Sequence, residues 1–513
     1  MKNKVVISIA KATVLLTLLT ILSKFIGLVR EMIYARNFGL TSQFDLFLVS
    51  AVIPIVINTS VIYLGQHYFI PAYNRVKSTS DDEAIKFFST TFWSFILGGV
   101  LLAFILFIFS GTIINIFLSS QSLEYREIGT EIFLLFLLTI PINAGMFIII
   151  AYQQANFHFI YPAVTQIIMN LVLIVIIIAF TNVFQIFVLP LAFLISYVSA
   201  FVIMFFPVRK FIKLNFNSIF KFRKNESNLS TVGALIIIEG LSLSYILVDR
   251  YFFGEIPSGS IAALNYAIII FTLPVSIFSI SLITTFFSKF SKFSVNNRPQ
   301  LILDFKKAVK VNIYIMLPVS IVLIFGGDFF IEIFYKRGKF TAANTILTHS
   351  VLQYYVISLV FYSSYLVIVK LLYSVNKYKH VLIISVLAFL LKVILNFSLV
   401  NTLQQEGLAL STSLVYVFLF LTGSFLVIKV LNMKNRYFHF IDILYFLVNA
   451  AVSYLVSYTF LNLYGGLGII TEITSIVLFL SIYIINSKLL NDEECGMIAN
   501  SVDLLLRKVK RQA

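Results

Sequence analysis

This sequence is poor in charge and has almost no cysteine. Only 12% of its 513 residues are charged, whereas about a quarter is usual in soluble globular domains. The single cysteine, Cys495, excludes an intramolecular disulfide framework and a multi-cysteine metal site, and we expect an ordinary reduced thiol there. No segment between the apolar runs is long, which leaves no room for a soluble catalytic domain.

The sequence also lacks the short motifs of nucleotide-driven pumps and zinc enzymes. No Gly-rich phosphate loop followed by Lys-Ser or Lys-Thr occurs, so an ATP site is not expected on this chain. No H-E-x-x-H spacing occurs, and the histidines are scattered at His67, His158, His349, His380 and His439. We therefore expect a protein without enzymatic activity, metal or cofactor.

What the sequence has in excess is apolar and aromatic residues. It is 60% hydrophobic, its mean hydropathy is +0.98, and it contains 54 Phe and 26 Tyr. A helix needs about 20 apolar residues to cross the hydrocarbon. The runs are continuous rather than alternating, which favours helices over a β-barrel. About fourteen spans of this length are expected, at 8–36, 44–70, 87–110, 130–152, 160–182, 187–208, 230–253, 262–288, 311–335, 350–373, 380–400, 408–430, 440–463 and 469–487.

The distribution of Lys and Arg orients these helices. The opening stretch "MKNKVVISIAKATVLLTLLTILSK" lacks a clean cleavage site, so we interpret it as the first span and not as a signal peptide. Most basic residues outside the spans occur in alternate loops and at both ends, whereas the opposite loops hold only Arg126, Lys336, Arg337 and Lys339. The positive-inside rule then places both termini in the cytoplasm. The net charge of +16 therefore indicates membrane topology and not nucleic-acid binding.

The two halves of the sequence resemble each other. A shift of 220 positions without gaps places Arg30 on Arg250, Gly39 on Gly259, Asp45 on Asn265, Pro54 on Pro274 and Asn156 on Asn376. An offset that spans six helices preserves their orientation. We therefore predict an all-α membrane protein with two parallel six-helix lobes, related by a pseudo-twofold axis along the membrane normal, and two C-terminal helices. Parallel repeats of this kind are typical of transporters.

This repeat predicts the domain organisation. The expected parts are an N-lobe at 1–208, a basic cytoplasmic linker at 209–229, a C-lobe at 230–430, two further helices at 431–490 and a cytoplasmic tail at 491–513. Pro54 and Pro274 should kink the second helix of each lobe. With Gly39 and Gly259 they are candidate hinges, and the alternative is that the kinks only shape the helices.

Arg30 is the most unusual charge inside the spans, where insertion of a charge costs roughly 2.5–3.5 kcal/mol. It precedes Gly39, the expected outer end of the first helix, by nine residues. That places it about 13 Å deep, near the midplane, so it should face a water-filled cavity. Glu31 lies on nearly the same helix face as Lys24, and a structural pair between the two is an alternative to a role in the cavity.

The remaining intramembrane charges leave alternatives open. Arg36 is close enough to the outer interface to snorkel, and Arg250 is adjacent to Asp249. Lys392 is central in its span and is a cavity candidate. Asp45 begins the second helix, where a carboxylate also serves as a cap. Glu239 is either protonated, paired across helices, or a site for a coupling ion.

Three stretches of the sequence resemble one known family. "SKFIGLVREMIYARNFGLTSQFDLFLVSAVIP" is similar to the pattern S-R-x-x-G-x-x-R-[DE]-x-x-x-A-x-x-F-G, followed by D-x-F and a proline, that opens the MurJ/MviN family. These are the lipid II flippases of the multidrug/oligosaccharidyl-lipid/polysaccharide (MOP) exporter superfamily. "VDRYFFGEIPSGSIAALNYAIIIFTLP" and "FYKRGKFTAANT" resemble two further blocks of that family. The resemblance covers most of the chain and implies a fourteen-helix flippase.

The sequence departs from the family at positions linked to the substrate. Family members usually carry an Arg pair after the second-helix proline and a further arginine in the eighth helix, and these are thought to meet the pyrophosphate of the substrate. Asn58, Thr59 and Ile269 stand at about those positions here. This leaves room for another polyprenyl-diphosphate-linked glycan than lipid II.

The residues and the resemblance together predict a flippase that moves a polyprenyl-diphosphate-linked saccharide across the bacterial cytoplasmic membrane by alternating access. An O-antigen or exopolysaccharide flippase and a multidrug/cation antiporter are the alternatives. We expect a monomer driven by the membrane potential or by H⁺, Na⁺ or Cl⁻, with the lipid tail along helices thirteen and fourteen. The candidate substrate-binding residues are Arg30, Lys24, Glu31, Arg36, Asp45, Arg250 and Lys392, and the candidate ion-coupling residues are Glu239 and Asp249.

Overall fold

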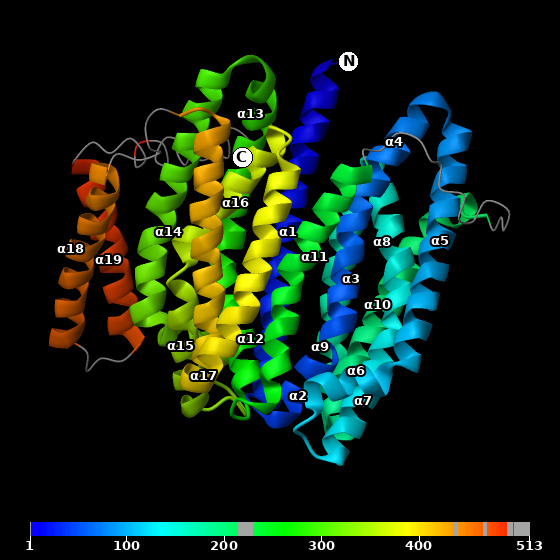
Figure 1. The fold of residues 1–513 in the computed structure, drawn as a ribbon, viewed down its shortest axis with the longest axis horizontal. Coiled ribbons are helices and arrows are strands. Elements are labelled where there is room, and N and C mark those ends of the chain that lie inside the picture. The colour runs from blue at the N-terminus through cyan, green and yellow to red at the C-terminus, as the bar shows by residue number, and fades with distance from the viewer. Residues whose placement is uncertain (1, 214–228, 434–439, 465–468, 490–495, 497–513) are drawn as a thin grey trace. The chain divides into compact units, whose positions relative to one another are not determined.

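The described residues of this protein are almost entirely helical (Figure 1). The computed structural model describes residues 2–213, 229–433, 440–464, 469–489 and 496, and these contain no strand. Cys495, His439, most of the expected linker and nearly all of the expected C-terminal tail lie outside the described residues. The prediction of an all-α protein is confirmed.

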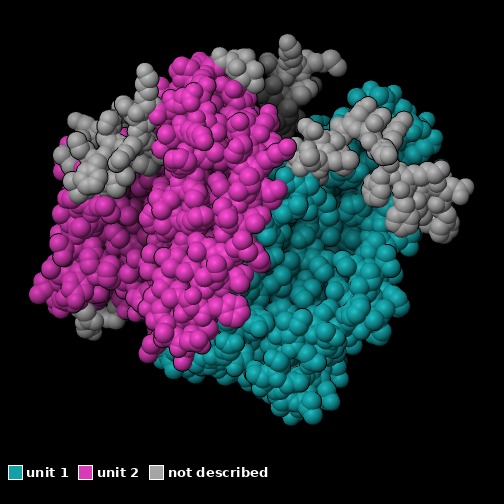
Figure 2. All heavy atoms as spheres, viewed as in Figure 1, with its two compact units in different colours: residues 1–262, 335–344 teal, residues 263–334, 345–513 magenta. Residues whose placement is uncertain are grey.

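The contacts divide the chain into two compact units, shown in different colours in Figure 2. Unit 1 comprises residues 1–262 and 335–344, and unit 2 comprises residues 263–334 and 345–513. The helix at Leu229–Tyr251 is thereby grouped with unit 1, whereas the sequence assigned it to the C-lobe. The lobe boundaries themselves stay a prediction.

Unit 1 contains eleven of the described α-helices, several with polar N-caps. The side chains of Thr41, Ser80 and Ser122 each accept a hydrogen bond from a backbone N–H in the first turn of the helix that follows. The helices are α1 (Lys2–Phe38), α2 (Ser42–Ser50), α3 (Val52–Leu64), α4 (Ile70–Thr79), α5 (Asp81–Ile108), α6 (Ser110–Leu118), α7 (Leu123–Leu137), α8 (Thr139–Ala155), α9 (Ile160–Phe184), α10 (Val188–Val208) and α11 (Leu229–Tyr251). α1 packs on α9, α5 on α8, α9 on α10, and α3 on α11.

Unit 2 contains the remaining helices. They are the greater part of α12 (Ser260–Pro274), then α13 (Ile280–Asn296), α14 (Arg298–Tyr335), α15 (Ala342–Val356), α16 (Leu359–Ser374), α17 (Tyr378–Val430), α18 (Phe440–Tyr464) and α19 (Ile469–Leu489). α13 and α17 pack on α16, and α18 packs on α19. Short π-helical turns at Gly65–Phe69 and Val275–Ser279 follow α3 and α12.

The described helices include many long enough to span a membrane. Eight helical stretches qualify by length and composition, or up to ten if each of two bent pairs is one span. Two of the eight, of 52 and 53 residues, are far longer than the roughly 20 residues of one crossing. Each contains a residue with positive φ that interrupts the helix, Gln185 or Gln404. The expected count of fourteen stays a prediction, and the multi-span helical class is confirmed.

Backbone geometry reveals the internal repeat of the chain. Gly39 and Gly259 both have positive φ, of 56° and 87°, so the offset of 220 holds there. Gln185 and Gln404 have φ of 47° and 49°, which is an offset of 219. The bent pair α15–α16 begins and ends 219 residues after α7–α8. The gapless match of Asn156 with Asn376 is therefore one residue out of register.

Both repeat prolines lie where a helix is interrupted. Pro54 falls in the first turn of α3 and has no N–H to donate to the carbonyl of Ser50. α2 and α3 meet there at a bend of 46°. Pro274 is the last residue of α12, directly before a π-helical turn. A bend is thus present near Pro54 and a π-helical turn after Pro274, and the role of both prolines as hinges stays a prediction.

Two adjacent glycines of α5 test how closely α5 packs on α8. A Cβ at Gly99 would lie 2.9 Å from Cα of Pro141, whereas a Cβ at Gly98 would meet nothing within 4 Å. We expect Gly99→Ala to lower stability by about 1–3 kcal/mol because the α8 backbone must shift. Gly98→Ala should be neutral or stabilising, since alanine favours a helix. Thermal unfolding of the purified variants in detergent measures both, and equal melting temperatures would contradict the packing.

Candidate functional site

A cavity of about 420 Å³ lies between α1 and α9 in unit 1. Six of its nine lining residues are polar: Thr20, Ser23, Lys24 and Arg30 from α1, and Gln166 and Asn170 from α9, with Leu19, Gly27 and Ala163 completing the wall. The volume is many times the roughly 30 Å³ share of one liquid water. The cavity is therefore large enough to hold water and a polar ligand group beside two cationic side chains.

Arg30 is held on the cavity wall by three neighbours. Its Nε donates to Oε1 of Glu31 at 3.2 Å, and Nη2 donates to the same oxygen. Its Nη1 donates to Oδ1 of Asn170 on α9 at 3.1 Å. The guanidinium carbon lies 5.6 Å from the ring centroid of Tyr34, one turn further along α1. These contacts fix the side chain in one orientation.

Arg30 nevertheless keeps a surface open to the cavity. Its side chain is 25% exposed, whereas that of Glu31 is 9% exposed. Arg30 lies eight residues before the end of α1 at Phe38, which corresponds to about 12 Å along the helix axis. A partly exposed arginine side chain at that depth agrees with the prediction that Arg30 faces a cavity. An approaching anion can use its free donor positions as a fork.

Glu31 is the ion-pair partner of Arg30. The ion pair that the structure shows for Glu31 is with Arg30, whereas the sequence offered Lys24 as the partner. Its second carboxylate oxygen, Oε2, is buried without a hydrogen-bond partner, and so is the Tyr34 hydroxyl, in the part of the chain that the structure describes. The carboxylate therefore retains hydrogen-bonding capacity close to Arg30.

The two other charges predicted on α1 differ in position. Lys24 is exposed and lines the same cavity as Arg30. Arg36 is exposed but is not among the residues that line the cavity. Its carbonyl accepts a hydrogen bond from the backbone N–H of Lys339 at 2.9 Å. The structure thus brings together Lys24, Arg30 and Glu31 and leaves Arg36 near the end of the helix.

Asp45 caps a helix other than its own. It is fully buried, and its two carboxylate oxygens accept hydrogen bonds from the backbone N–H groups of Gly259 at 2.6 Å and Ala262 at 2.7 Å. These amides form the N-terminus of α12, where a negative charge is favoured. The cap of α2 is Thr41, so the expected capping of the second helix by Asp45 is wrong. The carboxylate instead joins two loops of unit 1.

Arg250 belongs to the surroundings of Asp45 and not to the cavity. It is buried, its Nη1 donates to the carbonyl of Ile261 at 3.3 Å, and its charge acts on the Asp45 carboxylate. Arg250 is the penultimate residue of α11, whereas Arg30 lies two turns inside α1. The gapless repeat match of the two arginines therefore does not reflect equivalent positions. Asp249 is also buried.

Three glycines allow the loops around Asp45 to approach each other. Gly39, Gly259 and Gly338 all have positive φ. A Cβ on each would lie 2.3–2.6 Å from a carbonyl oxygen, namely that of Lys339, Leu40 or Arg36 respectively. A side chain at any of these positions would both strain the backbone and collide with a neighbouring loop. The sequence identified Gly39 and Gly259 but missed Gly338.

Lys392, a cavity candidate in the sequence, lies in unit 2 and is completely buried. It therefore does not face a water-filled cavity. Its ammonium donates to three oxygens: the Leu408 carbonyl at 3.1 Å, Ser411 Oγ at 2.8 Å and Thr412 Oγ1 at 2.6 Å. Leu408 follows Lys392 by sixteen residues, which is about 24 Å along a straight helix. The contact therefore shows that α17 folds back on itself at Gln404. Lys392 joins the two arms of this hairpin.

Glu239 is half-buried on α11 and forms a hydrogen bond with the Tyr63 hydroxyl of α3. This contact agrees with one of the three alternatives offered by the sequence, pairing across helices. It links two helices of unit 1. A role of Glu239 or Asp249 in ion coupling stays a prediction.

Comparison with known proteins identifies the family of this chain. The model of the lipid II flippase MurJ family matches residues 34–484. The chain belongs to the MurJ family.

Similar proteins include curated MurJ relatives and solved transporter structures. A probable lipid II flippase MurJ of Borreliella burgdorferi is 25% identical over 88% of both chains. The lipid II flippase MurJ of Thermosipho africanus is 26% identical over 79% of this chain and 83% of its own. A structure of lipid II flippase MurJ in an inward closed conformation has a TM-score of 0.76 at 23% identity, over 93% of this chain and 99% of that one.

The MOP superfamily shares this fold. An inward-facing multidrug transporter of the MATE family, within the MOP superfamily, has a TM-score of 0.63 at 13% identity, over 80% of this chain and 96% of its own. At that identity the likeness concerns the fold alone. It agrees with the predicted multi-span helical fold.

The positions where this MurJ family member lacks arginines are integrated into helix packing. Asn58 is buried, and its Nδ2 donates to Thr139 Oγ1 at 2.9 Å. Thr59 Oγ1 donates to the Ile55 carbonyl at 2.8 Å. Neither position supplies a cation, so the positive charge on the cavity wall of unit 1 comes from Lys24 and Arg30.

Sequence reasoning missed the α9 wall of the cavity. Gln166 and Asn170 are spaced by one helical turn within an otherwise apolar span, and both line the cavity. Asn170 also donates to the Gln166 carbonyl at 3.1 Å. Polar side chains at i and i+4 in a membrane helix mark one polar face. That signal was available in the sequence and could have identified both residues.

The Asp45 cap gives a testable stability difference. Asp45→Asn removes the negative charge that faces the α12 amides and Arg250, so we expect about 1–3 kcal/mol less stability. Asp81→Asn is the control because Asp81 is an exposed acid in the first turn of α5. Thermal unfolding of both variants in detergent provides the measurement. Identical melting temperatures for the two variants would rule out a stabilising role for the Asp45 charge.

The burial of Lys392 predicts that it affects stability and not ligand binding. Lys392→Met preserves the apolar stem but removes three buried hydrogen bonds, and we expect a loss of about 1–3 kcal/mol. Lys379→Met, at an exposed lysine of the same helix, should be neutral. The melting temperature reports the structural role, and binding of a prenyl diphosphate, measured at low temperature, reports a role in ligand binding. Unchanged melting with lost binding would contradict the structural role.

Proposed function

We propose that this MurJ family member moves a polyprenyl-diphosphate-linked saccharide of the lipid II kind across the bacterial cytoplasmic membrane by alternating access. The observation that carries the proposal is the Arg30 side chain, 25% exposed on the cavity wall beside Lys24. Two cations at one cavity suit a diphosphate, which presents several anionic oxygens. The family match and the names of the curated relatives support lipid II as the substrate.

Arg30 offers the diphosphate hydrogen-bond donors that are already oriented. Glu31 and Asn170 hold the guanidinium in place before the substrate arrives, so little side-chain freedom is lost on binding. Lys24 adds a mobile point charge six residues earlier on α1. The diphosphate replaces part of the Glu31 contact, and its charge is met by both cations.

The cavity chemistry favours an anionic headgroup over an organic cation. A multidrug/cation antiporter would need net negative charge where its ligand binds, and the unit 1 cavity is lined by Lys24 and Arg30 with no acid among its lining residues. Because Asn58 and Thr59 stand where the family usually carries an arginine pair, fewer cations are available here to bind the diphosphate. The effect of removing Arg30 should accordingly be large.

The remaining features of the transport cycle are part of the same proposal. Both termini face the cytoplasm, and the protein acts as a monomer driven by the membrane potential or a coupling ion. Moving one charge through 100 mV provides about 2.3 kcal/mol. The kinks at Pro54 and Pro274 act as hinges, with Gly39 and Gly259 at the loops, and the lipid tail lies along α18 and α19. The saccharide headgroup crosses within the aqueous path.

Complementation tests the proposal. The chain is expressed in cells depleted of their own lipid II flippase, and growth and lipid II accessibility at the outer surface are measured. We expect rescue by the wild-type chain. Failure of a well-expressed wild-type chain, together with restored O-antigen export in a strain lacking that flippase, would contradict lipid II as the substrate.

Substitution of Arg30 tests the cavity. Arg30→Ala should lower lipid II translocation at least about tenfold, because a charge-assisted fork contact is lost. Arg30→Lys should restore part of the activity, since it retains the charge without the fork. Arg75→Ala removes an exposed arginine of α4 and serves as the control. Full translocation by a normally expressed Arg30→Ala protein would overturn the proposed role.

A further inference from the structure

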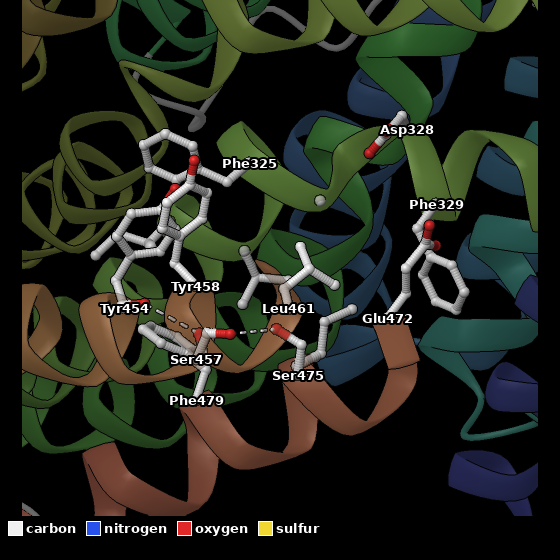
Figure 3. A pocket seen from close by; sticks show the side chains of 14 residues that line it. Phe325, Asp328, Phe329, Tyr454, Ser457, Tyr458, Leu461, Glu472, Ser475 and Phe479 are labelled. Carbon is white, nitrogen blue, oxygen red and sulfur yellow. Dashed lines mark hydrogen bonds between the residues drawn. The ribbon is translucent and has the colours of Figure 1, made fainter. Parts of the chain in front are cut away.

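A second cavity, of about 220 Å³, lies within unit 2 where α14 meets α18 and α19 (Figure 3). Its lining differs in kind from that of the α1–α9 cavity. It has three aromatic rings that stack in sequence, Phe325, Tyr454 and Tyr458, and two carboxylates, Asp328 and Glu472. None of its fourteen lining residues, all in the described part of the chain, is basic. The cavity thus combines ring faces with negative charge.

The α14 wall of this cavity is fixed by contacts outside it. α14 is interrupted at Gly326, where φ is −123° and ψ is 21°. Near the interruption, the carbonyl of Ile324 accepts hydrogen bonds from Gln353 Nε2 at 2.9 Å and from His349 Nε2 at 3.1 Å. Side chains of α15 therefore satisfy the backbone at the break. The break sets Phe325 and Asp328 on the two sides of Gly326.

The aromatic wall is equally well defined. The ring of Phe325 stacks on that of Tyr454, with centroids 4.2 Å apart, and Tyr454 stacks on Tyr458 at 5.7 Å. Ser475 Oγ of α19 donates to the Ser457 carbonyl of α18 at 3.2 Å, which joins the two helices beneath the rings. Figure 3 shows the three rings together on one side and Asp328 and Glu472 on the other. A ligand in the cavity meets both kinds of group.

The lining of this cavity differs from a simple interfacial aromatic belt. Leu461 lies three residues before the end of α18, and Glu472 lies in the first turn of α19. The cavity therefore reaches the ends of two candidate spans, whereas Tyr454 lies ten residues before the end of α18. Aromatic belts are common at the ends of spans, but their rings face lipid. Here the rings and the acids line one partly open pocket between three helices, in which Phe325 and Tyr458 are 56% and 46% exposed.

Ring faces attract cations, and aromatic groups combined with carboxylates are the chemistry that recognises organic ammonium groups. The Asp328 carboxylate is exposed and forms no hydrogen bond or ion pair within the described residues, so its charge is available to a ligand. A metal ion is a poorer fit because no group of three or more metal-binding side chains occurs among the described residues. A cation with an apolar surface uses both walls.

We propose that this cavity binds an organic ammonium group, with the three rings against its carbon atoms and Asp328 and Glu472 near its charge. The ammonium comes from the ethanolamine headgroup of a membrane lipid or from a soluble amine, which share this chemistry. The site is separate from the α1–α9 cavity and does not depend on the proposed flippase activity. Its occupation stabilises the junction of α14 with α18 and α19.

The test measures thermal unfolding of the purified full chain in detergent. One arm adds phosphatidylethanolamine or, in parallel, phosphatidylglycerol. The other arm adds choline chloride against sodium chloride of equal ionic strength. We expect the ethanolamine lipid or choline to raise the melting temperature, and phosphatidylglycerol and sodium chloride to have a smaller effect. Stabilisation by the ethanolamine lipid alone identifies a lipid headgroup, and stabilisation by choline identifies a soluble amine.

Variants assign the effect to the cavity. Glu472→Gln, Asp328→Asn and Tyr454→Leu should each weaken ammonium binding about tenfold. Glu124→Gln, at an exposed acid of α7, should leave it unchanged. The two amide variants are close in shape to the native residues, so they separate lost binding from lost folding. Absence of stabilisation by any ammonium compound, or equal stabilisation of the wild-type chain and Glu472→Gln, would overturn the proposal.

Discussion

A charge inside hydrocarbon must have a partner or water, and this constraint determines how the protein places its charged residues. The Arg30 guanidinium pairs with Glu31 and Asn170. The Asp45 carboxylate receives the amides at the start of α12. The Lys392 ammonium is surrounded by a carbonyl and two hydroxyl oxygens. Each of these three charges is therefore also a link between two segments of the chain.

The difference in exposure separates a ligand site from a structural link. Asp45 and Lys392 are completely buried, and their hydrogen-bonding capacity is used by the protein itself. Arg30 has comparable partners but retains a quarter of its side-chain surface. That surface lines a cavity with Lys24, Gln166 and Asn170. The same physical requirement thus yields a rigid junction in two places and an oriented anion site in the third.

Much of the fold could be predicted because it depends on composition and periodicity. Continuous apolar runs indicated membrane helices, and the repeat was visible through Gly39 and Gly259, whose positive φ only glycine adopts easily. The change of offset from 220 to 219 was not visible, because a gapless comparison cannot detect a one-residue difference in a loop. The pairing of Asn156 with Asn376 was wrong for that reason. The match of Arg30 with Arg250 was also misleading, because α11 ends sooner after its arginine than α1 does.

The candidate site could be predicted only in part, for a different physical reason. The depth of Arg30 follows from counting residues along one helix, so its position in a cavity could be anticipated. The fate of Lys392 and Asp45 depends on oxygens and amides that lie far away in sequence, such as those of Leu408 and Gly259. Hydrophobic periodicity carries no information about those partners. The α9 wall was overlooked because two polar residues in a long apolar run were not weighed as a pair.

The central claim is that Arg30 binds the diphosphate of the substrate. Isothermal titration of the purified chain with farnesyl diphosphate and with farnesyl monophosphate tests it directly, using the wild-type chain, Arg30→Gln and the control Arg75→Gln. Binding of the diphosphate should be tighter than that of the monophosphate in the wild-type chain and in Arg75→Gln. It should weaken at least about tenfold in Arg30→Gln. Equal affinity of Arg30→Gln and the wild-type chain for farnesyl diphosphate would contradict the claim.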